Sequence, residues 1–298
     1  MKTGKSKKVL AILLTITILC TVTGCKKESD AIRVGSKDFT ESLIVAEIYA
    51  LALEDAGLEV ERKLNIAGSI VHTSIVNDEI DLYPEYTGTG LLSVLKMELI
   101  TDPQEVYRVV KKEYEEQFDL VWLDSSKAND SQGLVIRTEL AKKLNIATIS
   151  DLQAQAEQVR FASQGEFDQR DDGIPGLEKI YGPFAFQSSK VYDNGLKYQI
   201  LLNNEADATP AYTTEGQLVN TDQFTLLADD RQMWPPYYLA PVVRADTLSE
   251  HPEITEILNR ISAALDTETV TALNAKADVE KQEYEEVARE FWNSMKEQ

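Results

Sequence analysis

Residues 81–92 carry the side chains of this chain that are best suited to hold a small molecule. The segment reads Asp-Leu-Tyr-Pro-Glu-Tyr-Thr-Gly-Thr-Gly-Leu-Leu, so a short apolar strand runs into tyrosines, threonines and glycines. Gly88 and Gly90 would let a ligand approach the main chain, and a helix after Gly90 would point its N-terminal amides back at the ligand. The pattern indicates a small-molecule site. The alternative is an ordinary strand, turn and helix with two core tyrosines.

Residues that could catalyse a reaction are sparse. The two histidines, His72 and His251, have no spaced Cys or His partner, and the sequence contains no Gly-x-Ser-x-Gly nucleophile turn. Glu85 and Asp81 are the remaining option, because two carboxylates can act as acid and base in a glycosidase. We favour a binding protein over an enzyme.

A metal site is not expected either. Asp168, Asp171 and Asp172 precede Gly173 and resemble a fragment of a calcium loop. The alternating ligands and the terminal bidentate glutamate of such a loop are missing. We therefore predict neither a metal nor a cofactor.

The elements that must position these side chains follow an α/β pattern, in which short apolar runs alternate with amphipathic stretches. Strands are predicted at 32–34, 58–64, 80–83, 121–123, 134–137, 159–162, 206–209 and 224–227. Helices are predicted over 39–56, after 69, after 90, over 103–118, 150–156 and 196–203, with three more between 251 and 293. Thr40 is the expected N-cap of the first helix, and Gly57 lies just past its end.

The length of the chain allows two lobes with separate cores and a cleft between them. We assign residues 31–129 and 236–298 to lobe 1 and residues 130–235 to lobe 2. The chain would then cross between the lobes twice and form a hinge. The second crossing, 234–238, reads Trp-Pro-Pro-Tyr-Tyr and is stiff and aromatic. The last three helices are expected to pack on lobe 1.

The N-terminus indicates export. Four lysines precede an uncharged stretch at 9–22, which is short for a membrane span but typical of a signal-peptide core. Residues 22–25, Val-Thr-Gly-Cys, resemble the lipobox of bacterial lipoproteins. We predict a signal peptide at 1–24, lipidation of Cys25 and a tether at 25–30. The alternative is a plain secretory peptide with an incidental cysteine.

Charge and cysteine content narrow the possible partners. The leader holds four of the 30 basic residues and none of the 50 acidic ones, which leaves 26 basic against 50 acidic side chains, a net charge of −24. Such a surface repels nucleic acid and draws cations, although acidity also serves solubility. Cys20 would leave with the leader and Cys25 would carry lipid, so no disulfide is expected.

Several short motifs of the chain are found together in one known family. They are residues 81–92, 165–167 (Gly-Glu-Phe) with 170–173 (Arg-Asp-Asp-Gly), 211–216 (Ala-Tyr-Thr-Thr-Glu-Gly), 235–237 (Pro-Pro-Tyr) and 240–244 (Ala-Pro-Val-Val-Arg). In these motifs the chain resembles the substrate-binding proteins of osmoprotectant ABC transporters. The resemblance covers essentially all of the chain after the leader. It implies a two-lobed, type II periplasmic-binding-protein-like fold and no enzymatic activity.

The same resemblance implies the ligand and the protein partners. Members of the family bind glycine betaine, carnitine, choline or proline betaine and pass them to a membrane permease powered by an ATPase. With its lipobox, the protein would be anchored by the Cys25 lipid on the extracytoplasmic face of the cell membrane of a bacterium, as in Gram-positive lipoproteins.

A trimethylammonium group explains why such a site needs aromatic residues. The group is positively charged but has no N–H, so charge-assisted hydrogen bonds cannot hold it. Each aromatic ring that faces it contributes about 0.5–2 kcal/mol through its quadrupole. The tyrosine cage of the resembled family falls on Tyr86, Tyr212 and Tyr237.

Further ligand contacts are implied at four other positions. Asp130 matches an acidic residue whose attraction for the cation strengthens as water leaves. Arg170 matches an arginine whose planar fork can grip a ligand carboxylate. Thr89 and Lys37 match positions that make polar contacts.

Gln132 departs from the family pattern. Members commonly read Asn-Asn-Thr-Tyr where residues 129–132 read Asn-Asp-Ser-Gln, so a fourth cage tyrosine is replaced by Gln132. Glutamine offers hydrogen bonds in place of a π-face, which suits a larger betaine such as ergothioneine. Glycine betaine and choline remain possible if Tyr83 or Tyr238 fills the gap. The alternative is that Gln132 is a neutral exchange at the rim of the site.

The expected mechanism is capture by lobe closure, because contacts from both lobes favour the closed state. The alternative from another class is a ligand-sensing lipoprotein that is not coupled to import.

Overall fold

The computed structural model describes residues 31–297 of the chain. The predicted signal peptide, the lipidation site Cys25 and the tether lie outside the described residues. Among residues 31–297, no helix is both long and apolar enough to cross a bilayer.

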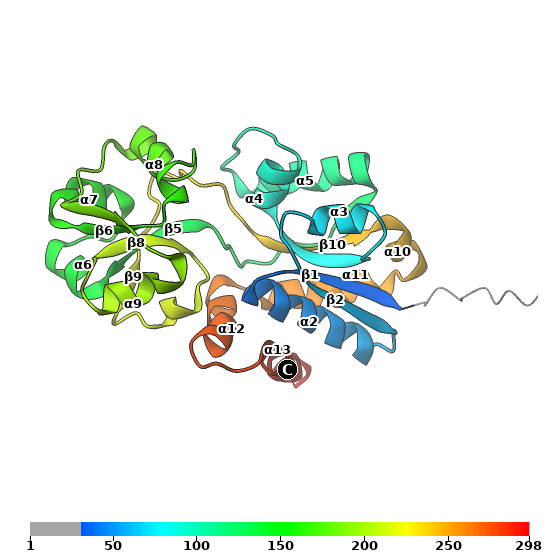
Figure 1. Cartoon of the computed structure of the whole chain (residues 1–298). Coiled ribbons are helices and arrows are strands. Elements are labelled where there is room, and N and C mark those ends of the chain that lie inside the picture. Colours follow the sequence, from blue (N-terminus) through cyan, green and yellow to red (C-terminus); the bar gives the residue numbers. More distant parts are fainter. Residues whose placement is uncertain (1–30, 298) are drawn as a thin grey trace, which may run out of the picture. The chain divides into compact units, whose positions relative to one another are not determined.

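The first of two five-stranded sheets has the strand order β2-β1-β3-β10-β4, and Figure 1 labels its strands β1, β2 and β10. Its strands are β1 (Ile32–Lys37), β2 (Val60–Ile66), β3 (Leu82–Tyr86), β4 (Leu120–Trp122) and β10 (Leu239–Arg244). β1 runs parallel to β2 and β3, whereas β10 runs antiparallel to both of its neighbours. The carboxyl ends of β1 and β3 therefore meet at one edge of the sheet, the usual place for a ligand in an open α/β sheet.

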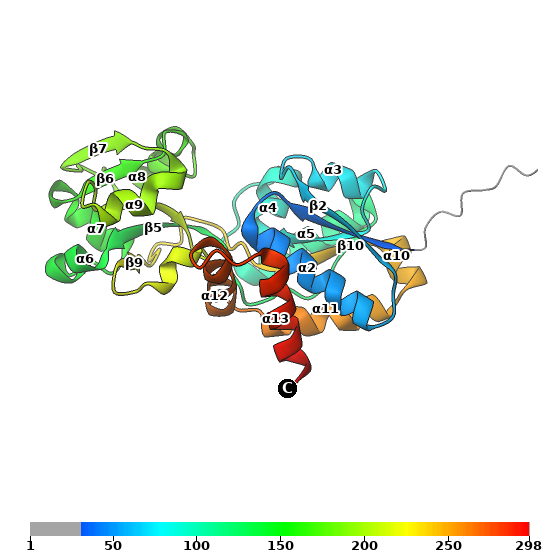
Figure 2. The ribbon, with the colours of Figure 1, turned by 60° about the horizontal axis from the view of Figure 1, so that its bottom comes forward.

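Helices pack on this sheet and bury two clusters of apolar side chains. One cluster lies under α2 (Thr40–Asp55), and the other under α3 (Val71–Val76) and α5 (Pro103–Phe118). The helices that follow β10 are α10 (Ala245–Glu250), α11 (Glu253–Ala264), α12 (Thr267–Asp278) and α13 (Tyr284–Lys296). The last three contact α2, as the sequence predicts for the C-terminal helices, and Figure 2 shows α13 alongside α2.

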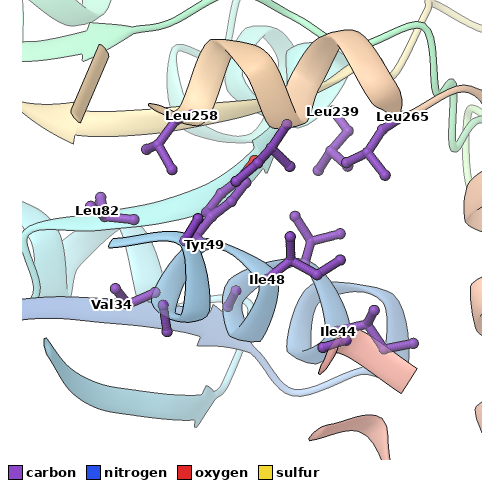
Figure 3. Packing of buried hydrophobic residues seen from close by; sticks show 14 of the residues in the cluster. Val34, Ile44, Ile48, Tyr49, Leu82, Leu239, Leu258 and Leu265 are labelled. Atoms are coloured by element: carbon purple, nitrogen blue, oxygen red, sulfur yellow. The ribbon is translucent and has the colours of Figure 1, made fainter. Parts of the chain in front are cut away.

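α2 is the central helix of the first core. Ile44, Ile48 and Tyr49 are almost completely buried and pack with Leu239 and Leu258, as Figure 3 shows. A helix that is covered on both sides is apolar over most of its circumference. Its polar residues therefore lie mostly at its two ends, and those of the first turn, Thr40, Glu41 and Ser42, lie beside the end of β1.

The predicted cap of α2 is wrong. The N-cap is Phe39, whose side chain makes no capping hydrogen bond. Thr40 instead begins the helix, and its Oγ1 donates a 2.7 Å hydrogen bond to Oδ1 of Asp278 on α12. The threonine thus ties the start of α2 to the end of a C-terminal helix.

The second sheet has the order β7-β6-β8-β5-β9. Its strands are β5 (Gln132–Arg137), β6 (Arg160–Ser163), β7 (Ser188–Val191), β8 (Ala208–Tyr212) and β9 (Phe224–Leu226). β6 runs parallel to β7 and β8, and β5 runs antiparallel to β8 and β9. Since β5 begins where β8 ends, Gln132 lies directly opposite Tyr212.

Short helices surround the second sheet. The α-helices are α6 (Thr138–Leu144), α7 (Ile149–Ala154), α8 (Ile174–Tyr181) and α9 (Lys197–Leu202), and the 3₁₀ turns are η2 (Ala156–Gln158), η3 (Glu166–Asp168), η4 (Asn194–Leu196) and η5 (Gly216–Val219). Phe161, Leu177 and Trp234 belong to its main buried cluster. Each sheet thus has a core of its own.

The chain passes between the two sheets twice, through residues 123–131 and 227–238. The two crossings are hydrogen-bonded to each other. Asp130 N donates to Tyr237 O at 3.0 Å, and Tyr237 N donates to Asn129 Oδ1 at 2.7 Å. A further hydrogen bond connects α12 to the segment that follows β8, because Asn274 Nδ2 donates to Thr214 O at 2.8 Å.

Candidate ligand-binding site

A cavity of about 430 Å³ lies where the ends of both sheets, the crossings and α12 come together. All eight ligand-binding residues predicted from the sequence line it, namely Lys37, Tyr86, Thr89, Asp130, Gln132, Arg170, Tyr212 and Tyr237. The other lining residues are Phe39, Thr40, Glu41, Ser93, Thr214, Glu215, Asn274 and Asp278, which the sequence analysis did not single out.

The first sheet contributes Lys37 and Tyr86 from the adjacent carboxyl ends of β1 and β3. Lys37 Nζ forms a buried ion pair with the Glu85 carboxylate and lies 5.1 Å from the centroid of the Tyr86 ring. The Phe39 ring packs against the Tyr86 ring, and the two ring centroids are 6.0 Å apart. Tyr86 is only 3% exposed. Its ring is therefore a firmly packed wall of the cavity.

Three carboxylates that line this cavity, those of Glu41, Asp130 and Asp278, form no salt bridge with the described residues, and Asp278 accepts a hydrogen bond from Thr40 Oγ1. Glu41 accepts 2.8 Å hydrogen bonds from Tyr86 Oη and from Asn274 Nδ2. Asp130 accepts a 2.6 Å bond from Thr214 Oγ1. The cavity wall therefore presents acidic groups that can ionise where a cation approaches.

Burial influences the protonation of Glu41 and Asp130. Loss of solvation raises the pKa of Glu41, and its hydrogen bonds only partly oppose that rise. Loss of solvation also raises the pKa of Asp130 well above its ordinary value, and the nearby charge of Glu41 raises it further. A bound cation would favour the ionised form of both groups.

The Thr89 segment departs from the predicted pattern. The helical turn begins at Thr87, in α4 (Thr87–Thr89), and continues into a π-helical segment, η1 (Gly90–Val94). Gly90 therefore lies inside the helical run and not before it. Thr89 and Ser93 both face the cavity.

Gly88 is required by the position of Tyr237. A Cβ at Gly88 would lie 2.7 Å from Cδ1 of the Tyr237 ring. Thr87 holds the main chain on both sides of Tyr237, because its Oγ1 donates to Pro236 O and accepts from Tyr238 N, each at 3.0 Å. The second crossing thus sets Tyr237 against the main chain of α4.

The second sheet presents Tyr212 and Gln132 side by side. Tyr212 is 44% exposed, and Lys197 Nζ lies 6.0 Å from the centroid of its ring. Lys197 is in turn paired with the Glu215 carboxylate. The Tyr212 ring is the most accessible of the three predicted cage rings, because Tyr86 and Tyr237 are more deeply buried.

Arg170 is engaged by an acidic neighbour. Its Nε and Nη2 donate to the two carboxylate oxygens of Asp172 at 2.7 and 2.5 Å. Gln132 Nε2 donates to the same carboxylate, with 2.5 Å to Oδ2. Asp172 therefore joins Arg170 to the residue that replaces the fourth tyrosine, a role that the sequence analysis missed.

Neither aromatic residue suggested as a substitute for that tyrosine lines the cavity. Tyr83 is fully buried and donates a 3.1 Å bond to Glu85 Oε2, and Tyr238 lines a separate pocket behind the crossings. Phe39 is the further aromatic residue that lines the cavity. Within residues 31–297, no group of three or more His, Cys, Asp or Glu side chains is arranged to hold a metal ion.

Several known proteins resemble this chain over most of its length. Residues 30–294 match the family described as the substrate binding domain of ABC-type glycine betaine transport systems. The carnitine transport binding protein OpuCC of Listeria monocytogenes is 33% identical, over 96% of each chain. The ergothioneine transport permease/ergothioneine binding protein EgtU of Helicobacter pylori is 31% identical, over 95% of this chain and 51% of that protein.

A solved structure shows the same fold. The crystal structure of a glycine betaine/carnitine/choline ABC transporter protein superposes with a TM-score of 0.82 at 28% identity, over 88% of this chain and 98% of that one. The predicted type II periplasmic-binding-protein fold is therefore confirmed. The chain belongs to the family of substrate-binding domains of ABC-type glycine betaine transport systems, and it is an extracytoplasmic, non-enzymatic binding component for quaternary ammonium solutes.

Proposed function

We propose that this protein captures a trimethylammonium compound of the glycine betaine, carnitine or choline type among Tyr86, Tyr212 and Tyr237. Lobe 1 (31–129 and 236–298) and lobe 2 (130–235) would close over the ligand. The loaded protein, anchored through Cys25, would then deliver it to the permease and ATPase of the importer.

The observation that carries this proposal is the meeting of aromatic rings and unpaired carboxylates in one cavity. Tyr86 donates its hydroxyl to Glu41, so one side chain presents a ring and orients an acid at the same time. A trimethylammonium ion can use both, since it is attracted by π-faces and negative charge without needing to donate a hydrogen bond. An ammonium ion could donate to the same carboxylates, but it has no methyl groups for the rings to contact and is more costly to remove from water.

A second candidate ligand is a larger trimethylammonium betaine such as ergothioneine. Gln132 stands where family members commonly carry a cage tyrosine. The relative EgtU is named as an ergothioneine binding protein. A cavity of about 430 Å³ has room for it.

The test is a calorimetric titration panel on the purified protein with glycine betaine, carnitine, choline and ergothioneine. Tetramethylammonium serves as a probe of the cage alone, and an ammonium salt as the control. We expect saturable binding of tetramethylammonium and at least one natural compound, and none of ammonium. Failure of all the trimethylammonium compounds to bind would remove the proposed ligand class.

Gly88→Ala is expected to weaken trimethylammonium binding about fivefold, because the new methyl group displaces the Tyr237 ring from the cage wall. Gly68→Ala is the matched control, since its Cβ would approach no atom closer than 3.8 Å. Titrations of both variants measure the effect. Equal affinities of the two variants would mean that Tyr237 does not contact the ligand.

A further inference from the structure

The C-terminal helix α12 contacts both halves of the protein. It packs against α2, which covers the first sheet, and against η5, which lies between β8 and β9 of the second sheet. The sequence analysis assigned the last three helices to lobe 1 alone. Besides the two crossings, α12 is thus a further connection between the lobes.

The contact with η5 brings two main chains together at Gly216. A Cβ at this residue would lie 2.6 Å from Ala275 N and 2.7 Å from Ala275 Cα. The main chain of a packed helix cannot turn aside as the end of a long side chain can. Glycine is therefore required at residue 216 by the close approach of α12.

Asn274 adds two hydrogen bonds to this contact. Its Nδ2 donates to Glu41 Oε2 and to Thr214 O, each at 2.8 Å. The opposite amide orientation would place Oδ1 against both acceptors, so the two donated bonds define how the side chain lies. Oδ1 is buried and has no hydrogen-bond partner among residues 31–297. A buried acceptor without a partner costs free energy, which the two donated bonds must offset.

The same bonds reach two acids of the cavity. Glu41 lines the cavity from the first turn of α2 and is 3% exposed. Thr214, whose carbonyl oxygen accepts from Asn274, donates its Oγ1 to the Asp130 carboxylate at 2.6 Å. The contact between α12 and lobe 2 therefore holds Glu41 and Asp130 in position together.

The contact lies beside the first crossing. At the start of α12, Thr267 Oγ1 accepts a 3.1 Å bond from Asn129 N. On the side of lobe 2, Thr213 Oγ1 donates to Asn129 O at 2.6 Å and accepts from Ser131 N at 2.8 Å. Both partners are thus tied to the same few residues of the crossing. Segments so close to a hinge move little when two lobes rotate, so we expect the contact to be kept in the open and closed states.

We infer that Asn274 is a positioning residue for ligand capture, which ties Glu41 to lobe 2 and makes α12 a third connection of the hinge. The lobes rotate about a pivot formed by the two crossings and the contact between α12 and η5. This inference rests on the proposed function, because it concerns how the same site is held ready for its cation. An acid that is oriented before the ligand arrives loses less freedom on binding, which raises the affinity.

The experiment titrates tetramethylammonium and choline by calorimetry into the wild type and two variants. Asn274→Ala removes both donors, and Gly216→Ala forces α12 away from η5. Each variant should weaken both ligands about tenfold, because Glu41 is no longer held and the angle between the lobes is no longer fixed. The double variant should lose hardly more than either single variant, because both substitutions break the same connection.

Thr271→Ala and Gly68→Ala are the matched controls. Thr271 Oγ1 donates to Thr267 O within α12 itself, and a Cβ at Gly68 would approach no atom closer than 3.8 Å. Both variants should bind the two ligands as the wild type does. Thermal unfolding without ligand checks that each variant is folded.

Hydrogen exchange of the wild type tests the pivot without any variant. A contact that is kept in both states protects the amides of residues 213–219 and 267–278 with or without ligand. Saturating tetramethylammonium should therefore slow their exchange no more than it slows that of α13, which does not line the cavity. For a contact that forms on closure, the ligand would slow exchange at least about tenfold more than in α13.

Four results would overturn the inference while leaving the proposed function standing. They are wild-type affinity in either folded variant, equal losses in the controls, a double variant that loses the product of the two single losses, and ligand-induced protection of the contact. The exchange measurement decides the matter even if the variants do not fold. Absence of binding by both ligands to the wild type would overturn the proposed function as well.

Discussion

Replacing Asp130 by asparagine is expected to weaken binding of a trimethylammonium ligand by about thirtyfold or more, since loss of a shielded charge partner costs about 2–5 kcal/mol. The Asp130 carboxylate lies in the first crossing, and Thr214 holds it toward the cavity. Asparagine keeps the shape and the hydrogen bond but removes the charge. Calorimetric titration of the wild type and the variant measures the loss.

The same variant should also flatten the pH dependence of binding. Burial and Glu41 raise the pKa of Asp130 in the free protein, whereas a bound cation favours its ionised form. Binding therefore releases a proton, and the affinity of the wild type falls as the pH falls below the raised pKa, by at most about tenfold per pH unit for one proton. Asp124→Asn, an exposed site in the same crossing, is the control. A wild-type affinity that does not change with pH would contradict this linkage.

Tyr212→Ala is expected to weaken the same ligand about twentyfold, because the ring supplies both a π-face and apolar contact with the methyl groups. The melting temperature of the ligand-free protein should hardly change, since the ring is 44% exposed at the end of β8. Titration and thermal unfolding measure the two quantities. Tyr212→Phe keeps the ring and should bind almost as the wild type does. Similar losses in both variants would assign the effect to the hydroxyl and not to the π-face.

Tyr86 would be a poor residue for that experiment. It belongs to the first core and hydrogen-bonds Glu41. Truncating such a buried aromatic residue to alanine typically costs about 3–5 kcal/mol of stability. A binding loss in Tyr86→Ala would therefore mix the cage with the fold, whereas Tyr212 separates them.

Local signals explain which elements could be predicted. α5 (Pro103–Phe118) was predicted at its observed bounds, because Asp102 caps it by accepting from Glu105 N at 2.8 Å and Pro103 occupies its first turn. β10 was missed, because a proline in a central strand argues against a strand. In the structure, Pro241 lies opposite Pro84 of β3. Two residues that lack an N–H thus face each other, a pairing that no single segment reveals.

The site shows the same division between local and long-range information. The three tyrosines, Asp130 and the other predicted residues lie in short motifs of their own and could be recognised there. Glu41 and Asn274 could not, because they are 233 residues apart and meet only when α12 packs beside α2. The pairing of Arg170 with Asp172 depends on the path of a loop, which the sequence pattern does not specify.

The late position of β10 in the chain has a consequence for the order of folding. β10 separates β3 from β4 in the first sheet, yet its residues are synthesised after the whole second sheet. Residues 32–122 cannot complete their sheet until residue 244 has been made, whereas residues 132–226 hold every strand of theirs. The second sheet can therefore form before β10 has joined the first sheet. Contacts between residues so far apart in the sequence are also slow to form. Assembly of the first sheet also brings the second crossing into place, and α12, which supplies Asn274 and Asp278, is synthesised later still, so we expect the cavity to be completed late in folding.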